Sequence, residues 1–136
     1  MEIRMDKSDF ITFVYPALLL IVGVVYVLCG KFSKPNFFIG YRNKLNRKNE
    51  TLWKISNFVS GIMFSCFAFF HCCVCLALIA IKYIAGLYMS LTLTVLVIIS
   101  QSLFLIELVV VIISTNTFIR WTKEKLKSSS PDESDY

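Results

Sequence analysis

The stretch FITFVYPALLLIVGVVYVLCG, residues 10–30, decides the fold, because it runs for 21 residues without a charged side chain. A helix of this length rises roughly 30 Å, which matches the hydrocarbon core of a bilayer. The apolar region of a cleaved signal peptide is shorter and ends at an A-x-A site, which does not follow here. We therefore expect residues 10–30 to stay in the protein as a first membrane span.

Two further apolar runs predict two more spans. Residues 58–81 contain one histidine and four cysteines but no formal charge, and residues 88–114 are rich in Leu, Val and Ile. The sequence therefore predicts an all-α integral membrane protein, a bundle of three transmembrane helices that forms one domain over residues 1–127. The remaining segment, residues 128–136, is polar and acidic, and we expect it to be a disordered tail.

The composition is typical of a membrane protein and argues against other classes. Hydrophobic residues make up 57% of the 136 residues and charged residues 17%, with a mean hydropathy of +0.69. The pI near 9.0 reflects cations beside the spans, facing lipid headgroups, and does not indicate direct nucleic-acid binding. All five cysteines lie in apolar runs, so disulfides are not expected. No catalytic or cofactor motif predicts an enzyme.

The distribution of lysine and arginine predicts the orientation. Eleven of these residues lie between spans one and two or after span three, and three lie in the opposite segments. Positive residues are retained on the cytoplasmic side of a membrane. We therefore expect the N-terminus outside, the C-terminus in the cytoplasm, and the basic loop of residues 31–54 on the cytoplasmic side.

This loop mixes seven cations with aromatic side chains, so we expect it to lie against the inner leaflet. Gly40 permits a turn that aims Tyr41 and Arg42 away from the flanking phenylalanines. Asn49 or Thr51 is expected to cap a helix that continues into span two. The loop is thus predicted to have a defined turn and a defined end.

One pattern in the loop has a counterpart in a known family. It consists of Ile39-Gly40-Tyr41-Arg42, then Lys48-Asn49-Glu50, Trp53-Lys54 and Asn57. The pattern resembles the signature of the SdpI family of bacterial membrane proteins, in which a GYRT-type motif follows a transmembrane helix and a tryptophan lies thirteen residues after the glycine. The sequence departs from the family at Asn43, where threonine is usual, and at Asn46 and Arg47, where Ser-Met is common.

The resemblance implies a three-span module in the plasma membrane of a bacterium. It implies immunity or resistance to a membrane-active secreted peptide toxin, with signalling to a cytoplasmic regulator through the loop, and it leaves homo-oligomer formation open. The candidate functional loop site comprises Gly40, Tyr41, Arg42, Asn49, Glu50 and Trp53. In a second interpretation these residues only fold the loop, with an arginine on lipid phosphate and a tryptophan at the membrane interface.

Glu107 is the one carboxylate within the predicted spans, where an ionised group is costly unless it is paired, protonated or hydrated. Counting from the outer end of span three places it about 27 Å deep, close to the cytoplasmic surface. Three interpretations stay open: a salt bridge to Arg42 or Lys54, a carboxylate that snorkels to the interface, or a proton or ligand site. Ser100 and Ser114 share its helix face, which predicts a polar seam inside the bundle.

His71 and Gln101 lie at similar depths, about 15 and 18 Å, in neighbouring antiparallel spans. We expect a hydrogen bond between them, with a proton relay as the alternative. The spacing of His71 and Cys75 permits ligation of a soft metal on one helix face. Small cysteines also pack well between membrane helices, so no metal is predicted.

Gly23, Gly30 and Gly61 are expected to mark close approaches between helices. A second function stays open beside toxin immunity, namely a small transport or structural subunit that acts through the Glu107 polar seam. The two functions differ in what Glu107 does, because transport requires its carboxylate chemistry whereas immunity requires only its contribution to folding.

Overall fold

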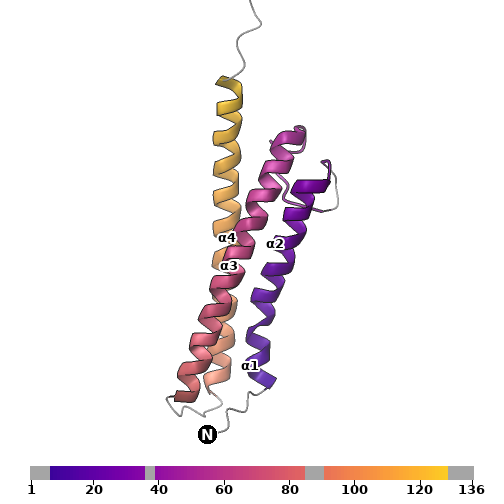
Figure 1. The fold of residues 1–136 in the computed structure, drawn as a ribbon. Helices are drawn as coiled ribbons and strands as arrows, with labels where there is room; N and C mark the ends of the chain where they lie inside the picture. The colour runs from indigo at the N-terminus through magenta and orange to yellow at the C-terminus, as the bar shows by residue number, and fades with distance from the viewer. Residues whose placement is uncertain (1–6, 36–38, 85–90, 129–136) are drawn as a thin grey trace, which may run out of the picture.

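The computed structural model describes residues 7–35, 39–84 and 91–128, which are largely helical (Figure 1). The helices are α1 (Lys7–Thr12), α2 (Val14–Phe32), α3 (Glu50–Ile84) and α4 (Leu91–Ser128). Three helical segments are long and apolar enough to cross a membrane: Asp9–Phe32, Glu50–Ile81 and Val95–Ser128. The predicted all-α, three-helix class is therefore confirmed. The predicted tail of residues 129–136 lies outside the described residues.

Helix α3 begins eight residues before the predicted span, because its first two turns are polar but still helical. The side-chain oxygen of Asn49 accepts the backbone N–H of Leu52 at 3.0 Å, which satisfies a donor that the helix itself leaves free. One turn on, Glu50 pairs with Lys54 at 2.7 Å. The prediction that Asn49 or Thr51 caps this helix is confirmed for Asn49. The segment that connects α2 to α3 is residues 33–49, which is shorter than the predicted loop of residues 31–54.

Helix α4 is longer than a membrane is thick. Its 38 residues rise about 57 Å, roughly twice the hydrocarbon thickness. Figure 1 shows its last turns standing beyond the ends of α2 and α3. In these turns Lys125 lies over the ring of Trp121, with the ammonium 4.2 Å from the ring centroid. The predicted span ended at residue 114, because hydropathy marks where apolar residues stop and not where a helix stops.

The helices are arranged with α3 in contact with both α2 and α4, and α2 and α4 touch each other far less. Helix α1 lies at the same end of the bundle as the last turn of α3 and the first turn of α4; we call this the α1 end (Figure 1). The Ser33–Asn49 segment lies at the other end, the loop end, together with the last turns of α4. The predicted pairing of the loop with the C-terminal helix end is thus observed.

Large apolar side chains are exposed along each of the three long helices. They include Ile21 on α2, Phe69 on α3 and Ile113 on α4, and Phe69 is 74% exposed. Water-soluble proteins rarely present apolar surface on this scale, whereas lipid chains solvate it without cost. The outer surface of the bundle is therefore suited to hydrocarbon.

One apolar layer crosses the middle of the bundle. It contains Leu19 of α2, Phe64 and Ala68 of α3, and Val111 of α4, which are all at least 96% buried. All three long helices therefore contribute buried apolar side chains at this level.

Glycines allow α2 and α3 to approach backbone to backbone. A Cβ placed on Gly61 would lie 2.6 Å from the backbone nitrogen of Val27 and 2.7 Å from the carbonyl oxygen of Gly23. A Cβ on Gly30 would lie 2.7 Å from the backbone nitrogen of Phe58. Membrane helices associate through such close packing, because lipid removes the hydrophobic driving force. The predicted close approaches at Gly23, Gly30 and Gly61 are confirmed.

We predict that Gly61→Val destabilises the bundle by about 2 kcal/mol, since the new side chain must push α2 away. Ala77→Val, on an exposed face of the same helix, is the matched control. The measurement is reversible unfolding in mixed detergent micelles, followed by tryptophan fluorescence. Equal unfolding midpoints for the two variants would contradict the close packing of α2 and α3.

Candidate functional site

The loop turns at Gly40 and is fastened there to α3. Gly40 has φ +110°, a conformation that side chains disfavour, and a Cβ would lie 2.5 Å from the side-chain oxygen of Asn57. That oxygen accepts the backbone N–H of Tyr41 at 2.5 Å, while the amide nitrogen of Asn57 donates to the carbonyl of Trp53 at 2.9 Å. The glycine is thus required both for the turn and for the closeness of the loop to α3.

A second buried asparagine holds the loop from within. The Asn46 side chain is fully buried, and its nitrogen donates to the carbonyl of Tyr41 at 2.9 Å and to the hydroxyl of Ser56 at 2.7 Å. Its oxygen accepts the backbone N–H of Asn43 at 2.8 Å. One buried amide thus satisfies the carbonyl of Tyr41 and the N–H of Asn43, as buried backbone groups require. Sequence reasoning missed Asn46, which it treated only as a departure from a family pattern.

Two loop side chains reach across to α4. The Tyr41 hydroxyl donates to the backbone carbonyl of Ile112 at 3.2 Å, and the Asn43 amide donates to the side-chain oxygen of Asn116. Asn43 also accepts the N–H of Leu45 at 3.2 Å, so the turn hydrogen bond expected of this position is present. Burial raises the pKa of the Tyr41 phenol, and nearby Tyr26 adds to the rise, so the phenol stays a hydrogen-bond donor at neutral pH.

A hollow of about 470 Å³, the loop cavity, opens between the loop, α2 and α4. The side chain of Arg42 is exposed at this cavity and brings the positive charge of a guanidinium group with five donors. Amide and phenol groups provide further donors and acceptors. The lining residues are Tyr26, Tyr41, Arg42, Asn43, Ile112 and Asn116.

The six residues predicted for the loop site divide into two groups. Gly40, Tyr41 and Arg42 form or adjoin the loop cavity. The other three do not: Asn49 caps α3, Glu50 is exposed and paired with Lys54, and Trp53 is fully buried. The structure thus brings three of the six predicted residues together at the loop cavity and places the other three outside its lining, because adjacency in a motif does not place side chains on the same face.

Trp53 lies inside the protein and not at the lipid interface. It is 0% exposed, and its indole N–H donates to the hydroxyl of Ser33 at 3.3 Å. It therefore joins the end of α2 to the start of α3. The expectation of a membrane-anchoring tryptophan is corrected, since the protein itself satisfies both the ring and its N–H.

A second polar group, the buried polar cluster of His71, Cys75, Ser100 and Glu107, lies between α3 and α4. The Nδ1 atom of His71 is 2.8 Å from Oε2 of Glu107, and Nε2 is 2.8 Å from the hydroxyl of Ser100. His71 is fully buried and Glu107 is 3% exposed. The predicted polar seam inside the bundle is thus present.

The predicted hydrogen bond between His71 and Gln101 is wrong. Gln101 is exposed on the lipid-facing side of α4, and the preceding residue, Ser100, faces His71 instead. One residue turns the side chain by about 100° around a helix, so equal depth does not bring two side chains together.

Glu107 also differs from its predicted salt bridge to the loop. Its partner is His71, not Arg42 or Lys54, and its burial excludes a snorkelling carboxylate. Glu107 lies twelve residues, or about 18 Å, along α4 from Val95 and five residues before Ile112, which contacts the loop.

The cysteines are free, and only Cys75 takes part in the buried polar cluster. Its thiol donates to the carbonyl of Thr12 at 3.6 Å. Within the described residues no group of three His, Cys, Asp or Glu side chains is arranged to hold a metal ion.

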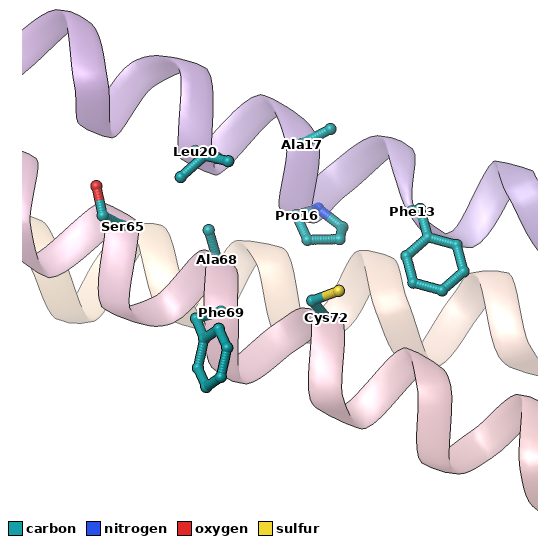
Figure 2. A pocket seen from close by; sticks show the side chains of 8 residues that line it. All are labelled: Phe13, Pro16, Ala17, Leu20, Ser65, Ala68, Phe69 and Cys72. Carbon is teal, nitrogen blue, oxygen red and sulfur yellow. The ribbon is translucent and has the colours of Figure 1, made fainter.

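An apolar groove of about 310 Å³ lies between α2 and α3 (Figure 2). Pro16 and Leu20 come from α2, and Ala68 and Cys72 face them from α3, while the ring of Phe69, which also lines the groove, points away from α2. Leu20 and Phe69 are at least half exposed, so in a bilayer the groove borders lipid. Its lining residues carry no charge, so the groove offers an apolar contact surface and no ionisable side chain other than the Cys72 thiol.

Comparisons of the chain with known protein families, with curated proteins and with solved structures found no match in any of the three.

We predict that Asn57→Ala loosens the loop, because it leaves the N–H of Tyr41 without its acceptor, a loss of about 1–3 kcal/mol. Amide hydrogen exchange at Tyr41 in detergent micelles should then be roughly ten times faster or more. Ser102→Ala, an exposed change in α4, is the control. Unchanged exchange at Tyr41 in Asn57→Ala would contradict this fastening of the loop.

Proposed function

We propose that this protein is an SdpI-like multi-pass membrane protein that gives immunity to a membrane-active secreted peptide toxin. The observation that carries the proposal is the loop cavity, which the Gly40-Tyr41-Arg42 motif builds against α4. Part of the pattern that resembles the family thus lines an accessible polar hollow, while its other residues hold the loop and the start of α3. The resemblance supplies the class of ligand, and the cavity supplies a place for it.

The chemistry of the loop cavity fits a peptide. A peptide presents carbonyl oxygens, N–H groups and a terminal carboxylate. The guanidinium of Arg42 binds carboxylates and carbonyls in a fixed geometry, and the amides of Asn43 and Asn116 both donate and accept. Tyr26 and Ile112 offer apolar contact for an adjoining side chain. A peptide that reaches this end of the bundle would be held there, and a cytoplasmic regulator would read the occupied loop.

The proposal places the loop end in the cytoplasm of a bacterium. Support comes from the charge distribution, because the loop and the last turns of α4 carry most of the cations and lie at the same end of the bundle. We predict that green fluorescent protein fused after Tyr136 fluoresces, and that alkaline phosphatase fused at the same point is inactive. An active phosphatase fusion and a dark fluorescent one would reverse this orientation.

The decisive experiment is the survival of a toxin-sensitive bacterium that expresses this chain and is challenged with the toxin that SdpI-type proteins resist. Wild type should protect, and Arg42→Ala should lose protection. Loss of one charge-assisted hydrogen bond, about 1.5–3 kcal/mol, weakens binding roughly tenfold or more. Arg47→Ala, which removes the same charge from an exposed position outside the cavity lining, is the matched control and should protect fully.

All variants are compared at equal abundance in the membrane, measured by immunoblotting. Absence of protection by the wild-type chain would reject immunity to this toxin. Equal loss in Arg42→Ala and Arg47→Ala would reject the loop cavity and leave only the net charge of the loop as the cause.

A further inference from the structure

The buried polar cluster is built around the only histidine of the chain. His71 has no contact with solvent, yet both of its ring nitrogens have a partner: Glu107 at Nδ1 and Ser100 at Nε2, each at 2.8 Å. Ionisable groups inside a membrane are rare, because they are costly, and they commonly mark a proton or ion pathway. The loop cavity lies elsewhere, at the loop end, and does not use these residues.

A proline supplies the next link of the cluster. In a continuous helix the carbonyl of Thr12 would accept the N–H of residue 16, but that residue is Pro16, which has none. The free carbonyl instead accepts the Ser100 hydroxyl at 3.3 Å and the Cys75 thiol at 3.6 Å. The cluster therefore connects α3 and α4 to the last residue of α1, just before α2 begins.

Counting protons gives two fully bonded arrangements of His71, Ser100 and Glu107. When Ser100 donates to the Thr12 carbonyl, Nε2 of His71 must donate to Ser100, and one further proton is shared between Nδ1 and Glu107. When Ser100 instead donates its single proton to Nε2, that nitrogen carries no proton of its own. His71 and Glu107 then keep only the proton at Nδ1, and the Thr12 carbonyl still accepts from the Cys75 thiol. The two arrangements differ by one proton, and the hydroxyl of Ser100 completes the hydrogen bonding in both.

The second oxygen of Glu107 is an independent sign of a proton site. Oε1 is buried and has no hydrogen-bond partner. A purely structural ion pair is stable in an apolar interior only when its remaining lone pairs are satisfied, and this one leaves an oxygen unsatisfied. A carboxyl group that takes up a proton together with His71 has no net charge to solvate, which agrees with the observed surroundings.

The surroundings of the pair differ toward the two ends of the bundle. Toward the α1 end lie polar groups: the Thr12 hydroxyl donates to the carbonyl of Asp9 at 2.7 Å, and the Asp9 side chain is itself buried. Toward the loop end lies the apolar layer, in which Val111 is one turn from Glu107. Polar groups therefore lie beside the pair on the side of the α1 end, and buried apolar side chains lie on the side of the loop end.

We propose that His71 and Glu107 form a proton-binding site that exchanges one proton with the α1 end through Ser100, while the apolar layer closes it from the loop end. The proton comes from water at the α1 end and is held on Nε2 of His71, as the hydroxyl of Ser100 turns from Nε2 to the Thr12 carbonyl. Other titratable side chains of the described residues near the pair are Cys72 and Cys75 on α3, Asp9 on α1 and Tyr15 on α2, whose ring packs on Phe104.

The test uses the single histidine as its own probe. Protein labelled with ¹⁵N-histidine is placed in vesicles with one orientation, and solid-state NMR follows the two ring nitrogens while the pH is changed on one side at a time. We expect Nε2 to change from the protonated to the unprotonated signal as the pH rises at the α1 end. A change on the loop side should leave both signals as they were.

Signals that do not move with pH on either side would overturn the proposal, as would signals that follow the loop side. Glu107→Gln should abolish the shared-proton signal at Nδ1, because an amide cannot exchange that proton, whereas Ser102→Ala on the exposed face of α4 should leave the titration unchanged. The wild-type titration decides the question even where a variant fails to fold. It is also independent of toxin survival, so the proton site and the loop cavity can fail separately.

Discussion

A polar group inside this bundle is costly unless it finds a partner within the protein, and that constraint organises the structure. Lipid offers no hydrogen bonds, so each buried amide, hydroxyl or imidazole costs several kcal/mol if it is left alone. In this bundle, buried polar side chains lie where α3 packs against α4 and where the loop packs against α3. Asn57, Ser60 and His71 of α3 are all fully buried; Asn57 bonds to the loop, and Ser100 and Glu107 of α4 bond to His71.

The same constraint explains why α2 is held differently. Helix α2 has few polar side chains to offer, and it joins α3 through the backbone contacts that Gly23 and Gly61 permit. Polar contacts are made just outside its two ends. Before it, the Thr12 carbonyl, which Pro16 leaves without a helical N–H donor, accepts the Ser100 hydroxyl; after it, Ser33 accepts the indole N–H of Trp53. Packing thus fixes the middle of α2, and hydrogen bonds fix where it starts and stops.

The sequence was sufficient for features that depend on one segment and insufficient for those that depend on two. Three long apolar helices follow from hydropathy, the cap at Asn49 follows from its local chemistry, and both are observed. The hydrogen-bond partner of His71 depends on how α4 is rotated about its axis relative to α3. The depth of a residue in the membrane does not give this rotation, so the sequence predicts Gln101 where the structure has Ser100. The role of Asn46 is not evident from the sequence for the same reason, because it consists of hydrogen bonds to Tyr41 and to Ser56 of α3.

The two polar centres of the bundle share one rigid element. Glu107 of the buried polar cluster and Ile112 of the loop cavity are five residues apart on α4, about 7.5 Å along its axis. The helix between them is continuous, and Val111 fills the core there without a void of its own. A rotation or slide of α4 that altered the contact with His71 would move the carbonyl that receives the Tyr41 hydroxyl by a similar amount. Coupling between such sites requires an element with two arrangements that both sites bias. The two hydrogen-bond arrangements proposed for Ser100 belong to one of these sites, and α4 is the element that both sites contact.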